Sequence, residues 1–144
     1  MPEFKLLLVC TGNTCRSPMA EAIARQVLAD REGVSVSSAG VSAVDGMAAS
    51  PEAVEAMREQ GLDLSGHRSR ALTPAMVAEA DQIYTLTASH RRALLDLVPE
   101  AEVKVQRLES GGDIVDPVGG SLALYRDTAA QIRRALEARL LPTE

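Results

Sequence analysis

Cys10 and Arg16 stand at the two ends of a short glycine-containing segment, Cys-Thr-Gly-Asn-Thr-Cys-Arg, which Ser17 and Pro18 follow. The apolar run before it ends in Leu-Leu-Leu-Val and is typical of a strand buried on both faces. After it, Pro18 is predicted as the first residue of a helix that Ser17 caps. The free N–H groups and positive dipole end of this helix would face the segment, as they do in anion sites.

Cys10 therefore has the expected surroundings of a nucleophile. A helix N-terminus and a nearby guanidinium lower the pKa of a thiol from about 8.5 to roughly 3.5–7.5, so we expect a thiolate at neutral pH. The planar guanidinium of Arg16 suits two phosphate oxygens, and the Ser17 hydroxyl can donate to the sulfur when an intermediate breaks down. The predicted phosphate-binding residues are Thr11, Gly12, Asn13, Thr14, Cys15, Arg16 and Ser17.

Other interpretations of this segment fit less well. A lone cysteine at the end of a strand is most often a small apolar core residue, but here the arginine, the glycine and the helix start accompany it. The segment lacks the Gly-Lys-Ser/Thr of nucleotide-binding loops and the Gly-x-Gly-x-x-Gly of dinucleotide sites. The combination favours phosphate chemistry on Cys10.

With Ser-Pro-Met-Ala-Glu-Ala after it, this loop resembles the phosphate-binding loop of the low-molecular-weight protein tyrosine phosphatases. Ser-Ala-Gly-Val at 38–41 resembles the family's segment beside the active site, and Asp116-Pro117 with Gly-Gly-Ser at 119–121 resembles its acid loop. The resemblance implies a cysteine-dependent protein phosphatase that works through a phosphocysteine intermediate. It also implies that Cys10 is the nucleophile, Arg16 the phosphate clamp and Asp116 the general acid.

Asp116 taken alone would be a turn residue, because Asp-Pro before Gly-Gly is a common turn sequence. The chemistry, however, requires a proton donor for the leaving group. Neither histidine is better placed by sequence, since His67 falls in a polar turn and His90 near the start of a helix, where packing roles are expected. Two cysteines and two histidines without ligand spacing predict no metal site and no cofactor.

The substrate class has two candidates. Phosphotyrosine slots usually have aromatic walls, whereas the aromatic residues Phe4, Tyr84 and Tyr125 fall in strands or on a core stripe. The positions that resemble the family's pocket walls are Val44 and Val118, which are therefore predicted to contribute to specificity.

Thr14 is the third predicted specificity residue. By resemblance, tyrosine-directed members carry a bulkier aliphatic residue at this position, whereas bacterial protein-arginine phosphatases carry threonine. Its hydroxyl and the Asp116 carboxylate suit a donor-rich guanidinium. The sequence favours removal of phosphate from phosphoarginine in proteins, with a tyrosine phosphatase as the alternative.

Two further alternatives are weaker. Related arsenate reductases need redox cysteines outside the loop, and this chain has none. A non-catalytic phosphate-binding module would have no use for an intact Cys10, Arg16 and Asp116.

Cys15 has two interpretations. It can fill space beneath the loop, or it can be a resolving thiol that captures oxidised Cys10 as a reversible disulfide, which would be transient in a reducing compartment. Asn13 is predicted to adopt left-handed backbone geometry within the tight loop.

Composition indicates one globular domain, residues 1–144, with 46% hydrophobic and 24% charged residues. No apolar run approaches the ~20 residues of a membrane span and the first residues lack a signal-peptide pattern, so a cytoplasmic protein without a membrane partner is expected. A net charge of -5 without a basic cluster argues against nucleic acid as a partner.

The elements that must position these residues alternate between strands and helices. This alternation predicts an α/β fold, a three-layer sandwich in which helices flank a four-stranded parallel sheet. Such sheets place their sites at the carboxyl ends of strands, where Cys10 falls. Strands are predicted at 5–9, 34–37, 82–87 and 103–107, and helices at 18–30, 51–60, 74–80, 91–97 and 121–141.

Overall fold

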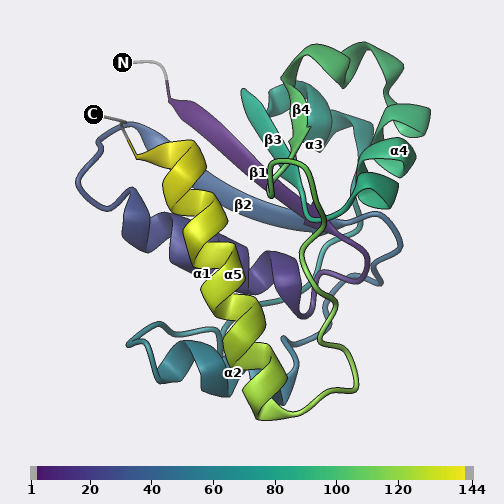
Figure 1. Cartoon of the computed structure of the whole chain (residues 1–144). Helices are drawn as coiled ribbons and strands as arrows, with labels where there is room; N and C mark the ends of the chain where they lie inside the picture. The colour runs from purple at the N-terminus through teal and green to yellow at the C-terminus, as the bar shows by residue number, and fades with distance from the viewer. Residues whose placement is uncertain (1–2, 142–144) are drawn as a thin grey trace.

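Four parallel strands form the central sheet of the computed structural model, which describes residues 3–141 (Figure 1). The strands are β1 (Phe4–Cys10), β2 (Val34–Gly40), β3 (Gln82–Thr85) and β4 (Val105–Arg107), in the order β2-β1-β3-β4. The predicted four-stranded parallel sheet is confirmed. The predicted domain of 1–144 includes residues 1–2 and 142–144, which lie outside the described part of the chain.

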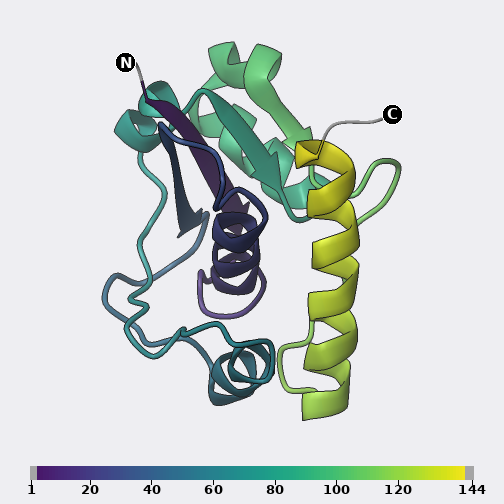
Figure 2. The same cartoon turned by 90° about the vertical axis from the view of Figure 1, so that its left-hand side faces the viewer.

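Helices cover both faces of this sheet (Figures 1 and 2). They are α1 (Arg16–Val27), α2 (Pro51–Arg58), α3 (Pro74–Glu79), α4 (Ala88–Leu97) and α5 (Leu122–Leu140), with a 3₁₀ helix, η1 (Pro99–Lys104), before β4. Leu6 and Leu8 of β1 pack with residues of α1, α2 and α5. Leu7 and Val9 pack with residues of α3 and α4 on the other face. Because both faces of β1 are covered, its apolar run is continuous, and the predicted three-layer sandwich is confirmed.

Several predicted boundaries were wrong. The strand predicted at 103–107 begins only at Val105, because Pro99–Lys104 form the 3₁₀ helix, in which Val103 is 94% exposed. The strand predicted to reach residue 87 ends at Thr85, since Thr87 caps α4 by accepting a hydrogen bond from the His90 N–H at 3.1 Å. That helix therefore begins three residues before the predicted position. In β2 the strand continues to Gly40, which pairs with Cys10.

Arginines bind the outward-facing carbonyls of both edge strands. On β2, Arg25 donates to the Val36 oxygen at 2.9 Å and Arg70 donates to the Ser38 oxygen at 3.2 Å. On β4, two more arginines donate to main-chain oxygens: Arg91 to Val105 at 3.2 Å, and Arg139 to Arg107 at 2.6 Å.

Candidate active site

The loop of residues 11–15 connects the carboxyl end of β1 to the first turn of α1. Cys15 is the N-cap residue, without a side-chain cap, and the helix begins at Arg16. The prediction that Ser17 caps the helix and Pro18 is its first residue was therefore wrong. The helix starts earlier, and the Ser17 side chain is turned toward Cys10 instead.

A directed chain of hydrogen bonds ends on the Cys10 sulfur. Ser17 Oγ lies 2.8 Å from Cys10 Sγ, and Asn13 Nδ2 donates to the same Ser17 oxygen at 2.9 Å. An amide nitrogen can only donate, so Ser17 accepts from Asn13 and has its own proton available for the sulfur. The Asn13 backbone N–H also donates to Cys10 Sγ, at 3.3 Å. The sulfur thus faces two donors, as a thiolate requires.

Asn13 organises the interior of the loop. It is fully buried, and its φ of 56° confirms the predicted left-handed geometry. Its Nδ2 also donates to Ser38 Oγ at 2.9 Å, and its Oδ1 accepts from the Arg70 N–H at 2.8 Å. Beside it, Gly40 has no room for a side chain, because a Cβ there would lie 2.9 Å from the Asn13 nitrogen and would collide with the Thr11 carbonyl oxygen.

Burial is the largest influence on the acidity of Cys10, and it raises the pKa of this thiol. The hydrogen bonds from Ser17 and Asn13 and the positive charge of Arg16 act in the opposite direction. The sequence prediction of a lowered pKa was wrong in its net direction, since it counted the groups that favour the thiolate but not the loss of water around the sulfur.

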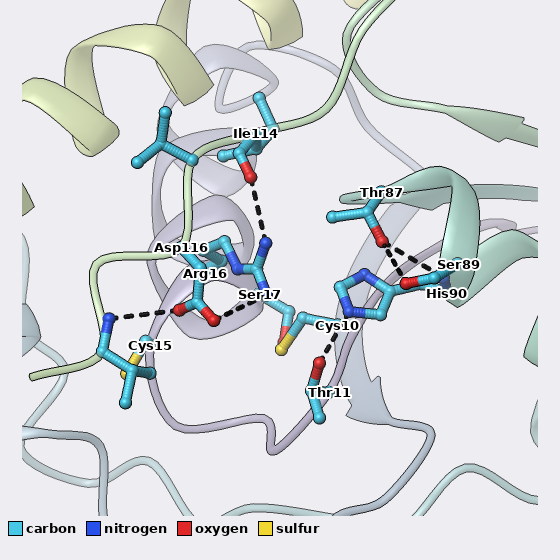
Figure 3. A network of polar contacts seen from close by, with 12 residues as sticks. Cys10, Thr11, Cys15, Arg16, Ser17, Thr87, Ser89, His90, Ile114 and Asp116 are labelled. Atoms are coloured by element: carbon cyan, nitrogen blue, oxygen red, sulfur yellow. Dashed lines mark hydrogen bonds and ion pairs between the residues drawn. The ribbon is translucent and has the colours of Figure 1, made fainter.

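Arg16 and Asp116 lie together on one side of Cys10 (Figure 3). Arg16 donates to the Ile114 carbonyl oxygen at 3.0 Å, which fixes its guanidinium, and its other terminal nitrogen lies 3.6 Å from Asp116 Oδ2. The Asp116 side chain is 56% exposed, and its Oδ1 accepts from the Val118 N–H at 3.1 Å. The fold therefore brings Asp116, which is distant in sequence, next to Arg16 of the loop that begins at Cys10.

Both histidines contact the loop, which the sequence analysis missed. His90 is buried and its Nε2 lies 2.7 Å from Thr11 Oγ1 (Figure 3). His67 Nε2 lies 2.7 Å from the Asn13 carbonyl oxygen. The expected packing role is thus correct only in part, since the surface they pack against is the phosphate loop itself. One signal was available: the first turn after β3 lies at the same sheet edge as the loop after β1, so His90 could have been placed near Cys10.

Cys15 points away from the loop mouth into a small polar cluster. Its Sγ lies 3.3 Å from the Tyr125 hydroxyl and 3.5 Å from Ser50 Oγ. Burial is the main reason why the pKa of Tyr125 rises to about 12, so the phenol stays protonated. Both cysteines are free thiols in this structure. The packing interpretation of Cys15 is consistent with these contacts, and the resolving-thiol role stays a prediction.

The predicted pocket walls are aliphatic and open to solvent. Val44, in the loop after β2, is 70% exposed, and Val118, beside Asp116, is 67% exposed. The chain's aromatic side chains lie elsewhere: Tyr84 and Tyr125 are buried, and Phe4 begins β1 at the end opposite Cys10. Thr14 is half-buried, with its hydroxyl 3.8 Å from Cys15 Sγ.

Residues 3–141 contain neither a candidate metal site nor a candidate membrane-spanning helix. Within that range, no cluster of three or more His, Cys, Asp or Glu side chains could hold a metal ion. No described helix combines the length and the apolar character that crossing a membrane requires.

Comparisons with known proteins agree with this geometry. A family model described as "Low molecular weight phosphotyrosine protein phosphatase" matches residues 5–142. A probable low molecular weight protein-tyrosine-phosphatase, EpsP, of Ralstonia solanacearum is 41% identical over 135 residues, which cover 92% of this chain and 91% of EpsP. A protein-arginine-phosphatase of Bacillus subtilis is 40% identical over 138 residues, 91% of each chain.

A solved structure of a cysteine-to-serine mutant of the YwlE arginine phosphatase, with a phosphorylated active-site serine, superposes with a TM-score of 0.87. It is 38% identical and the match covers 92% of this chain and 91% of that one.

Proposed function

The chain belongs to the low molecular weight phosphotyrosine protein phosphatase family, and we propose that within it this protein removes phosphate from phosphoarginine in cytoplasmic proteins. One observation carries the chemistry. The Cys10 sulfur lies 2.8 Å from a Ser17 hydroxyl that already accepts a hydrogen bond, while Arg16 lies 3.6 Å from Asp116. These contacts support the proposal that Cys10 is the nucleophile, Arg16 the anion clamp and Asp116 the proton donor.

In the first half-reaction the phosphoryl oxygens bind the Arg16 guanidinium and the loop N–H groups, which have no carbonyl partner within the helix. The reactive form of Cys10 is the thiolate, which the hydrogen bonds of Ser17 and Asn13 and the charge of Arg16 favour against the effect of burial. This thiolate attacks phosphorus, and the S–P bond forms as the bond to the leaving nitrogen or oxygen breaks. Asp116 acts as the general acid and gives a proton to the leaving group. Its exposed position at the loop mouth is consistent with that role.

In the second half-reaction water attacks the phosphocysteine. Asp116, now a carboxylate, takes a proton from this water, and the S–P bond breaks to give inorganic phosphate and the thiolate. Ser17 stabilises the returning negative charge on sulfur through the proton directed at it. The phosphorylated active-site serine in the YwlE mutant is consistent with covalent chemistry in that protein.

Three observations support phosphoarginine over phosphotyrosine. Val44 and Val118, the residues predicted to form the pocket walls, are exposed valines, whereas a phosphotyrosine slot usually has aromatic walls. Thr14 puts a hydroxyl in the loop, and a relative that is 40% identical is named a protein-arginine-phosphatase. The tyrosine alternative has its own support in EpsP, which is 41% identical.

The deciding experiment compares kcat/KM on peptides that differ only in carrying phosphoarginine or phosphotyrosine. We expect the wild-type enzyme to prefer phosphoarginine, and a preference for phosphotyrosine would establish the alternative. Cys10→Ser is the control in both assays, since it should abolish turnover but retain vanadate binding through Arg16 and the loop amides. Substantial turnover by this variant would contradict the assignment of the nucleophile.

A further inference from the structure

The contact between α4 and the loop points to a role for His90 that the proposed mechanism does not yet contain. We infer that His90 is a positioning residue, whose Nε2–H donates to Thr11 Oγ1 and so leaves the Thr11 hydroxyl proton for a phosphoryl oxygen bound in the loop. The inference rests on the proposed function, because it concerns the anion that the loop binds.

The geometry connects two elements at one point. Thr11 directly follows Cys10 and is an exposed residue, while its carbonyl oxygen accepts from the Ser42 N–H at 2.9 Å. His90 lies in the first turn of α4 and is only 3% exposed. The 2.7 Å distance between Nε2 and Oγ1 is a short, well-formed hydrogen bond. The loop backbone and the histidine therefore hold Thr11 from two sides.

The proton on the imidazole can be assigned from its other nitrogen. Nδ1 of His90 is buried and has no hydrogen-bond partner in the described part of the chain. A buried N–H without a partner is rarer in proteins than a buried acceptor without one. The neutral ring therefore carries its proton on Nε2 and donates it to Thr11.

The charge state is consistent with this tautomer. The pKa of His90 is lowered to about 4, mainly by burial and secondly by the nearby positive charge of Arg16, although Asp113 and Asp116 oppose the shift. At neutral pH the ring is uncharged and has one proton to donate. Since Thr11 Oγ1 accepts that proton, its own hydroxyl hydrogen is directed away from His90. The bound phosphoryl group is the acceptor that the open mouth of the loop offers it.

The first test measures inhibition by vanadate and by inorganic phosphate, with turnover of nitrophenyl phosphate as the reporter. Thr11→Val should weaken both inhibitors about tenfold, the usual effect of a lost hydrogen bond to an anion, and Thr11→Ser should restore binding. His90→Phe should weaken them by a smaller factor, and His90→Phe with Thr11→Val should be no weaker than Thr11→Val alone. Additive losses would overturn the inference.

The matched control is Ser89→Ala, which removes a hydroxyl 3.0 Å from Thr87 Oγ1 on the same helical turn but away from Thr11. It should leave inhibition unchanged. A purely structural role for His90 would lower the melting temperature of His90→Gln without changing inhibition. Vanadate and phosphate should inhibit His90→Gln more strongly than His90→Phe but less strongly than wild type, since the glutamine amide nitrogen can donate to Thr11 in place of Nε2.

Nitrogen NMR of the imidazole gives an answer that does not depend on activity. The expected spectrum has a protonated Nε2 and an unprotonated Nδ1 at pH 7, and the opposite tautomer would overturn the inference. Failure of the proposed function would be visible separately, as wild-type protein without cysteine-dependent turnover. In that case calorimetry can still measure whether Thr11→Val binds phosphate more weakly than wild type does, as the inference requires.

Discussion

Replacing Ser17 with alanine tests the hydrogen-bond chain around the Cys10 sulfur. Ser17 is fully buried, so water does not take the place of its hydroxyl in the variant. A hydrogen bond to a charged group contributes roughly 1.5–3 kcal/mol, which corresponds to about a 10- to 150-fold change in rate. We expect kcat of Ser17→Ala on nitrophenyl phosphate to fall within this range, since the thiolate is the leaving group when phosphocysteine is hydrolysed.

The same variant should change the acidity of Cys10. The Ser17 hydrogen bond lowers the pKa of this thiol against the effect of burial. Without it the pKa rises further, so the midpoint of iodoacetate alkylation should move to higher pH. At a fixed neutral pH, alkylation should be slower than in wild type.

Ser38→Ala is the matched control. Asn13 Nδ2 donates to Ser17 and to Ser38 at 2.9 Å in each case, so both variants remove one acceptor from the same amide group. Of these two serines, only Ser17 has a hydrogen bond with the Cys10 sulfur. If Ser17→Ala and Ser38→Ala lose the same activity, or if the alkylation midpoint does not move in Ser17→Ala, then the hydroxyl does not stabilise the thiolate and this reasoning fails.

Four other predictions concern single residues. Asp116→Asn should reduce kcat roughly 100- to 10,000-fold on phosphoarginine, less on phosphotyrosine and least on nitrophenyl phosphate, because a more basic leaving group depends more on protonation by Asp116. A small loss of equal size on all three substrates would mean that Asp116 is only a turn residue. After inactivation by peroxide, dithiothreitol should restore the activity of wild type but not of Cys15→Ala. Equal recovery of activity in both proteins would leave Cys15 with a packing role only. Thr14→Ile should lower kcat/KM on phosphoarginine peptides by the equivalent of about 1–3 kcal/mol and leave turnover of phosphotyrosine peptides intact. If the ratio of kcat/KM on the two substrates does not change, Thr14 is not a specificity residue. Folding lowers the pKa of His90 from 6.5 to about 4, so the unfolded chain takes up a proton first as the pH falls, and the wild type should lose on the order of 2–3 kcal/mol of unfolding free energy between pH 6.5 and pH 4. Urea titrations of His90→Gln should not show this loss. An equal pH dependence of the unfolding free energy in the two proteins would disprove the prediction.

The sheet and the phosphate loop were predictable because their signals are local. The continuous apolar run of β1 indicates burial on both faces, and the loop motif specifies its own neighbours. Boundaries failed where a competing hydrogen bond or a proline decides them, as at Thr87, which caps α4, and at Pro99, which begins the 3₁₀ helix. Such competition is settled by tertiary structure and not by the pattern of a short window.

The site was predictable only for residues with a chemical motif. His90 was assigned to packing because its contact with Thr11 spans 79 positions of sequence and needs the order of the strands to be known. The pKa of Cys10 was predicted in the wrong direction for a related reason. Burial comes from the whole fold, whereas the loop sequence reveals only the charges and donors next to the sulfur.

The arginines on β2 and β4 have a consequence for the protein at high concentration. An open sheet has two rims at which another chain could add a strand, and bare main-chain oxygens there are what such a strand would pair with. In this fold, guanidinium groups from neighbouring elements already hold two outward-facing oxygens on each rim. A strand from another chain would meet positive charge and occupied hydrogen-bond acceptors at both edges of the sheet. The same arginines that fasten helices and loops to the sheet therefore also protect the folded chain against edge-to-edge aggregation.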